Sequence, residues 1–179
     1  MIDLDAYSVF ADYKASLKET SEDKQNKQYM MPEAEESVVH FENATKAFVK
    51  NRGIVIPKNE PQPLKAVDAL MVKDGLILFV EFKNGKNIDP RDLRDKIRHS
   101  ILTFLAVTSL TMADLQASAV MIVVYNPDAV KSETKLSAAV ARNAGECIFS
   151  RGLGYIQRMF LREVRAYTPK EFEEYLASK

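Results

Sequence analysis

Hydrophobic residues recur at the three- and four-residue spacing of an amphipathic helix in several parts of the chain. The pattern predicts helices over residues 4–18, 32–51 and 87–110, and from Ser132 to about residue 145. The helix over 87–110 is expected to begin at Asp89 and Pro90, a capping residue followed by a residue suited to the first turn. A further helix is expected after Thr168, because Thr168, Pro169 and Glu171 have the order of a capping box.

Mostly apolar runs rich in β-branched residues predict the strands. These runs are residues 54–57, 64–73, 76–85, 118–126 and 155–167. Asp74 and Gly75 separate the second run from the third, and this dipeptide between two strands predicts a tight hairpin. The run SAVMIVVYN at 118–126 is almost entirely apolar, which is typical of a strand covered on both faces. The element order predicts an α/β fold in which helices flank a mixed sheet with an antiparallel hairpin at its centre.

The beginning of the chain has a different character from the rest. Residues 18–33, KETSEDKQNKQYMMPE, are polar and have no helical or strand period, so they predict a linker. We therefore expect an N-terminal amphipathic helix with a polar linker over residues 1–31, and an α/β domain over residues 32–179. The pattern leaves open whether this helix packs on the domain or contacts a partner chain.

The predicted hairpin has a consequence for three charged residues. A turn centred on residues 74–75 sets a register in which Asp68 lies opposite Glu81, with Cβ atoms roughly 4.5 to 5.5 Å apart. Lys83 lies two residues after Glu81, so it points to the same face of the sheet. The neighbouring positions are apolar, which puts the two acids at the rim of a buried surface.

Two opposed carboxylates repel each other, and the repulsion grows as water is withdrawn. A proton on one acid, an ion pair with Lys83 or a shared divalent cation could each offset it. Hard ions such as Mg²⁺ bind a few carboxylate oxygens and keep water on their remaining positions. Such an ion acidifies a bound water and stabilises charge on a phosphoryl group, while a nearby lysine orients that water. These residue types are therefore suited to hydrolysis of a phosphodiester.

With Asp68 late in one strand and Glu81-x-Lys83 on the next, followed by a helix and an apolar strand, the chain resembles the PD-(D/E)xK restriction-endonuclease-like nucleases. The order of elements expected over residues 32–126 is similar to the family's core. The resemblance implies a nuclease in which Asp68 and Glu81 bind Mg²⁺ or Mn²⁺ and Lys83 attends the water. Val67 stands where the family's proline would be, which is a departure from the motif.

Many members of this family add an acid from the helix before the hairpin. Glu42 lies beside the apolar stripe of that helix and is the first candidate as a third metal ligand, with Glu35 in reserve. Members also use a residue of the following helix, and the candidates there are Arg94, Lys96 and Arg98, among which the spacing does not choose.

Composition limits where such a site could work. The chain has 179 residues, enough for one domain with a core, and equal numbers of Lys plus Arg and Asp plus Glu. It therefore has no overall positive field for nucleic acid or for an anionic membrane. Cys147 is the only cysteine, which excludes disulfides within the chain and fits a reducing, cytoplasmic location. No apolar run approaches the ~20 residues that span a bilayer, and we expect no membrane contact.

The expected substrate is DNA rather than RNA, reached with the help of a second copy of the chain or of a partner protein bound through the N-terminal helix. The first alternative is a nuclease-fold module whose site is vestigial and which acts by binding protein or nucleic acid. In the second, the acids are accidental neighbours, and Glu81 and Lys83 form a solvated strip on an edge strand. Three arginines of the last predicted strand could rim a groove or could simply be edge charges: Arg158, Arg162 and Arg165.

Overall fold

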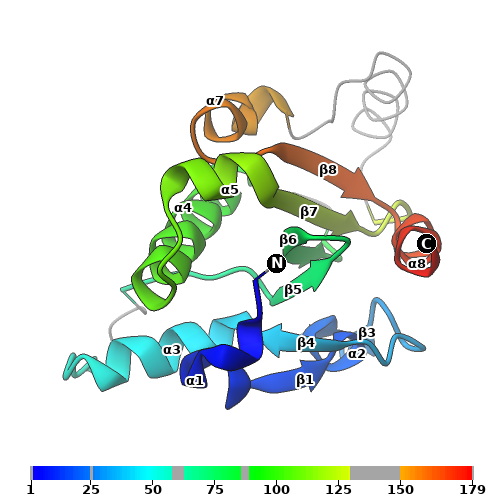
Figure 1. Ribbon diagram of the computed structural model, residues 1–179. Coiled ribbons are helices and arrows are strands. Elements are labelled where there is room, and N and C mark those ends of the chain that lie inside the picture. The colour runs from blue at the N-terminus through cyan, green and yellow to red at the C-terminus, as the bar shows by residue number, and fades with distance from the viewer. Residues whose placement is uncertain (1, 25, 58–62, 86–88, 130–149, 179) are drawn as a thin grey trace.

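The computed structural model describes residues 2–24, 26–57, 63–85, 89–129 and 150–178 (Figure 1). Its main sheet has six strands in the order β1-β4-β5-β6-β7-β8. Pairing is antiparallel from β1 to β6, and β6, β7 and β8 are parallel. The strands are β1 Lys14–Ser16, β4 Ser37–His40, β5 Ala69–Lys73, β6 Leu76–Lys83, β7 Ala119–Tyr125 and β8 Glu163–Tyr167. The expected fold class, a mixed sheet flanked by helices, is confirmed.

Helices cover both faces of this sheet (Figure 1). They are η1 Leu4–Ala6, α1 Ser8–Ala11, α2 Leu17–Thr20, α3 Phe41–Asn51, α4 Pro90–Val107, α5 Met112–Ser118, α7 Ser150–Phe160 and α8 Pro169–Ala177. A separate two-stranded sheet pairs β2 Glu22–Asp23 with β3 Gln28–Tyr29.

The two faces of β6 belong to two hydrophobic cores, because successive side chains of a strand point to opposite sides. Phe79 forms T-shaped ring contacts with Phe41 of α3 and with Phe104 of α4. Leu78 belongs to the second core, which includes Phe172 of α8. The residues of both cores are almost completely buried, so packed side chains cover the sheet on both faces.

The hairpin forms in the predicted register. Lys73 pairs with Leu76 and Ala69 with Val80. Asp74 and Gly75 have φ values of 52° and 76°, as required of the central residues of a type I′ turn. The shape of the turn therefore fixes which residues of β5 and β6 face each other.

The helix expected over residues 4–18 is not formed. This stretch contains η1, α1, β1 and α2, and β1 pairs with β4 at the edge of the main sheet. A short isolated helix is marginal in water, and the hydrogen bonds of β1 to β4 compensate for breaking it. Phe10 and Leu17 are fully buried in the two cores of the sheet, so they are not free to bind a partner chain. The expected linker after residue 18 contains the rest of α2 together with β2 and β3, and it buries Met31.

We expect that replacing Phe10 with leucine lowers the free energy of unfolding by about 1.5 kcal/mol, because the ring of Phe10 stacks on that of Phe104 with centroids 5.9 Å apart. The urea midpoint measures this change. The exposed neighbour Ser8, replaced with alanine, is the control and should leave the midpoint almost unchanged. Equal midpoints for the Phe10 variant and the unmodified protein would show that this segment does not pack as described.

Three other predicted elements need correction. The helix expected over 32–51 begins only at Phe41, since residues 37–40 form β4. Residues 54–57 form no strand, and β4 takes the place beside β5. The strand expected over 155–167 is a helix up to Phe160, because buried Leu153 and Ile156 have helical spacing, and only Glu163–Tyr167 is strand.

Other sequence predictions have mixed outcomes. The hydrogen bonds of the expected capping box at Thr168 and Glu171 are present, and Asp89 accepts a hydrogen bond from the backbone as the cap of α4. Helix α5, with its own capping box at Thr111 and Asp114, was not predicted. The helix expected from Ser132 falls outside the described residues.

Within the described ranges, no single helix is long and apolar enough to cross a membrane. Residues 91–107 and 112–118 reach that length and composition only as a pair, and the two helices are bent by 118° at the break between them.

Candidate functional site

The candidate site lies where β5 begins and β6 ends. Asp68 is the residue just before β5, and hydrogen bonds from β6 and from the first residue of α3 fix its position. Its Oδ2 accepts a hydrogen bond from the backbone N–H of Phe82 at 2.7 Å, and its carbonyl accepts one from Phe41 at 3.0 Å. The N–H of Val67 donates to the hydroxyl of Ser100 at 3.0 Å, which ties the same segment to α4.

Glu81 is the most deeply buried acid of the site, with a side chain only 1% exposed. Its Oε1 lies 2.7 Å from Nζ of Lys83 and 2.6 Å from Nζ of Lys96. Its Oε2 is buried and has no hydrogen-bond partner among the described residues. A buried carboxylate oxygen without a partner has a cost, so this atom can accept a further donor or a cation.

Lys96 joins the two acids. Its Nζ lies 3.8 Å from Oδ1 of Asp68 as well as 2.6 Å from Glu81. Of the α4 candidates, Lys96 is the one that reaches both carboxylates within the described part of the chain, whereas Arg98 pairs with Asp95. We call the four side chains Asp68, Glu81, Lys83 and Lys96 the acid–lysine cluster. Sequence spacing predicted three of its members together and left the fourth undecided.

Further charges continue from the cluster to the surface. Nζ of Lys83 lies 3.5 Å from Oδ2 of Asp92, and Oδ1 of Asp92 lies 2.8 Å from Nζ of Lys65. Positive and negative groups therefore alternate along this line. Asp92 is therefore a second carboxylate partner of Lys83, which the sequence analysis did not identify.

The electrostatics of the two acids differ from those of a surface pair. Burial and the charge of Glu81 raise the pKa of Asp68 to about 7, although Lys96, the N–H of Phe82 and Lys83 act in the opposite direction. Burial alone would lower the pKa of Lys96. The neighbouring carboxylates of Glu81 and Asp68 have the larger combined effect and raise the pKa of this ammonium above its ordinary value. The two lysines therefore offset part of the repulsion between the two carboxylates.

A pocket of about 250 Å³ gives access to Asp68. Its wall includes the segment that was expected to be a linker. The lining residues are Thr20, Ser21, Glu22, Asp23, Lys24, Met30, Glu42, Asp68, Phe82 and Asn84. Asn84 donates a hydrogen bond to Asp23 at 2.8 Å and accepts one from Asn126 at 2.7 Å, which fixes this wall to the end of β6.

Glu42 lines the same pocket as Asp68, but its carboxylate is paired with Lys46 at 2.6 Å. Glu35 is exposed and precedes β4, so it is not on the helix where it was expected. No group of three or more His, Cys, Asp or Glu side chains among the described residues is arranged to hold a metal ion. Glu42 therefore does not complete a ligand set with the two acids as they stand.

The residues fit a hard divalent ion in part. Two converging carboxylates, one with an unpartnered buried oxygen and one with a raised pKa, provide the oxygen ligands that Mg²⁺ or Mn²⁺ takes. The ammonium of Lys96, however, is already the shared counterion of both acids. Asp68 and Glu81 could hold an ion only if Lys96 changes its contacts.

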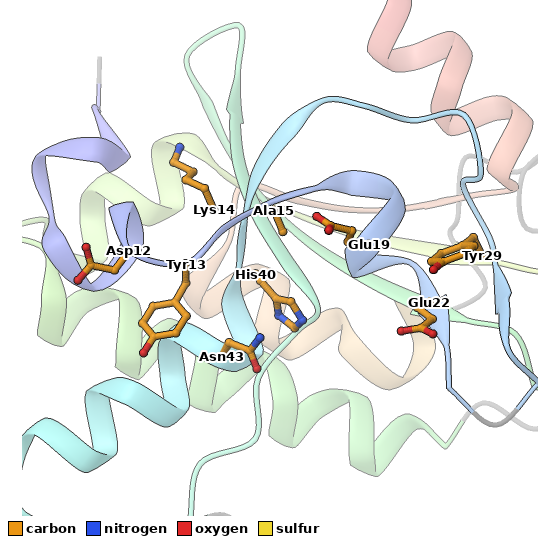
Figure 2. Close-up of a pocket in the computed structure, with 9 residues that line it drawn as sticks. All are labelled: Asp12, Tyr13, Lys14, Ala15, Glu19, Glu22, Tyr29, His40 and Asn43. Atoms are coloured by element: carbon orange, nitrogen blue, oxygen red, sulfur yellow. The ribbon is translucent and has the colours of Figure 1, made fainter.

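A second pocket adjoins the first, and the two share Glu22 (Figure 2). In Figure 2, Asp12 and Tyr13 lie on one side of His40, and Glu22 and Tyr29 lie on the other. Its lining contains three carboxylates, Asp12, Glu19 and Glu22, against the single ammonium group of Lys14, so it is acidic on balance. Such a lining disfavours the binding of anions in this pocket.

The remaining residues considered from the sequence lie away from the cluster. Histidines 40 and 99 were expected on helices; His40 is instead the last residue of β4, whereas His99 is on α4 and accepts a hydrogen bond from the N–H of Lys65. Arg158 is on α7, Arg162 donates to the carbonyl of Ala117, and Arg165 pairs with Glu163.

In comparisons with known proteins, no family model, no curated protein and no solved structure matches this chain. The function must therefore be argued from the site itself.

Proposed function

We propose that the protein is a metal-dependent nuclease that hydrolyses phosphodiester bonds in DNA, with a restriction-endonuclease-like core. The observation that carries this proposal is the meeting of Asp68 and Glu81 with Lys83 at the end of the β5–β6 hairpin. A nearly buried glutamate on a central strand, with an unpartnered oxygen, is poorly explained as a solvated strip on an edge strand.

The arrangement of β5, β6, α4 and β7 supports such a core. The hairpin is followed by α4, and β7 then pairs parallel to β6, as the family's order implies. The family's core begins with a helix that is followed by three neighbouring strands, whereas here β4 precedes α3 in the chain and still lies next to β5. The set of neighbouring strands is therefore similar, while the chain order of one strand differs.

Asp68 and Glu81 are the residues that would hold Mg²⁺ or Mn²⁺, and the ion would supply an acidified water and stabilise charge on the phosphate. Lys83 is held between Glu81 and Asp92, so its ammonium is oriented before substrate arrives. A fixed positive group of this kind can orient the attacking water and stabilise the negative charge that develops on phosphate. Lys65 and Lys96 add positive charge near the same place.

Replacing Lys83 with alanine tests this role. We expect the cleavage rate to fall roughly 100-fold, the low end for loss of a positioned catalytic group. The assay uses supercoiled, linear and single-stranded DNA with Mg²⁺ or Mn²⁺, and a parallel series with RNA tests the choice of DNA. Lys170, whose side chain is 86% exposed on α8, is replaced with alanine as the control and should leave cleavage unchanged. A Lys83 variant that cleaves as fast as the unmodified protein would contradict the proposed role.

A second candidate function is a vestigial module of the same fold that binds nucleic acid or protein without cleaving. The observation in its favour is that Lys96 already forms ion pairs with both acids. In that case no DNA or RNA substrate is cleaved, and Mn²⁺ leaves the melting temperature unchanged. A partner protein or a second copy of the chain would then determine what the module does.

A further inference from the structure

The position of Lys96 has a consequence for the proposed metal site. Its ammonium makes ion pairs with both Asp68 and Glu81, and these are the two residues proposed as metal ligands. The side chain is 22% exposed, so it has a route toward solvent. Lys83 contacts the same oxygen of Glu81 but has Asp92 as a second carboxylate partner, so it can remain in place when Glu81 changes partners.

The charges of the acid–lysine cluster are balanced. When Asp68 is ionised, two carboxylates and two ammonium groups sum to zero, so the cluster has no net negative charge that calls for a divalent ion. An ion added to the unchanged cluster would bring a net charge of about +2 and would lie close to an ammonium, a costly arrangement where water is scarce. Either an ammonium leaves the acids or an anion enters with the ion.

We propose that Lys96 is a built-in counterion that competes with the divalent ion for Asp68 and Glu81, and that, once released from them, it binds the phosphate of the substrate. This inference rests on the proposed function. Without substrate, metal binding is weakened by the free-energy cost of breaking the ion pairs of Lys96. A phosphodiester offsets this cost because its phosphate becomes the new ion-pair partner of the Lys96 ammonium. By linkage, metal and nucleic acid then strengthen each other's binding.

The variant that tests this is Lys96→Met, which keeps a long flexible side chain and removes the charge. Mn²⁺ affinity is measured by calorimetry and by the rise in melting temperature, without nucleic acid and without any cleavage step. We expect Lys96→Met to bind Mn²⁺ about tenfold more tightly than the unmodified protein. Lys96→Arg, which keeps the charge, is the matched control and should bind no more tightly than the unmodified protein.

The second half of the experiment adds a short oligonucleotide with a non-cleavable backbone. It should increase the Mn²⁺ affinity of the unmodified protein about fivefold or more, and have a smaller effect on Lys96→Met. Equal or weaker Mn²⁺ binding by Lys96→Met overturns the inference. If Lys96→Met does not fold, Lys96→Gln is titrated in its place, with the same outcomes deciding.

The outcome also separates this inference from the proposed function. If Lys96→Met binds Mn²⁺ more tightly but the unmodified protein cleaves no nucleic acid, the counterion role of Lys96 is supported and the nuclease function is overturned. Equal Mn²⁺ binding by both proteins, together with cleavage by the unmodified one, overturns the counterion and leaves the nuclease. Absence of Mn²⁺ binding in both overturns both.

Discussion

Replacing Glu81 with glutamine is expected to lower the free energy of unfolding of the metal-free protein by about 3 kcal/mol. The carboxylate is 1% exposed and is the nearest ion-pair partner of both Lys83 and Lys96, so its loss leaves these lysines only their longer ion pairs with Asp92 and Asp68. The value lies at the low end for a broken buried pair because both lysines keep about a fifth of their surface exposed and can turn to water. Urea unfolding at pH 7 in the presence of a chelator measures it.

The same variant should cleave DNA about 10³-fold more slowly or not at all, because it removes a proposed metal ligand. Glu163→Gln is the matched control: Glu163 also pairs with a cation, Arg165, but lies on β8 and is 41% exposed. That control should change both stability and cleavage little. A Glu81 variant as stable as the unmodified protein would show that the two ion pairs do not contribute as described.

The hairpin could be predicted because its information is local. Asp74 and Gly75 set the turn, and the register of β5 and β6 then follows from counting residues. The meeting of Asp68 with Glu81 and Lys83 required no knowledge of the rest of the chain. The predicted register is confirmed, and with it the nearness of these three side chains.

Lys96 could not be chosen from Arg94, Lys96 and Arg98 because the rotation of α4 relative to the sheet depends on packing. Leu93 and Ile97 are buried against the sheet, and this places Lys96 on the flank of the helix that faces the end of β6. Asp92 lies four residues earlier, one turn away on that flank, and it contacts Lys83. The four-residue spacing of Asp92 and Lys96 indicates that they share one side of the helix, but only the packing of α4 shows that this side faces the site.

The prediction of one helix and a linker for the N-terminal segment is wrong because the contacts that determine its structure are distant in sequence. Phe10 stacks on Phe104, and Asp23 is bonded to Asn84, 61 residues away. A polar stretch such as residues 18–33 has no pattern of its own, yet it forms one wall of the pocket at Asp68. Long-range packing overrode the local helical pattern of the first residues.

Replacing Asp68 with asparagine is expected to stabilise the metal-free protein and, under the proposed function, to abolish metal binding and cleavage. The pKa of Asp68 is raised from 3.8 to about 7 in the folded protein, so between about pH 4 and 7 the folded state keeps a proton that the unfolded state has lost. The free energy of unfolding therefore falls as the pH rises through this window, and the cost of the ionised carboxylate remains at pH 8. Asparagine removes the cost and can still accept the hydrogen bond from Phe82.

At pH 8 in chelator, we expect this variant to be about 2 kcal/mol more stable than the unmodified protein, and the difference to shrink toward zero near pH 4. Added Mn²⁺ should raise the melting temperature of the unmodified protein but not that of the variant, and cleavage should fall about 10³-fold or more. Asp74→Asn, in the exposed turn of the same hairpin, is the control and should reproduce the unmodified protein in every measurement. A stability gain with an unchanged response to Mn²⁺ would mean that the repulsion between the acids is real but that Asp68 does not bind the ion. Loss of stability at pH 8 would mean instead that the ion pair with Lys96 outweighs the repulsion from Glu81.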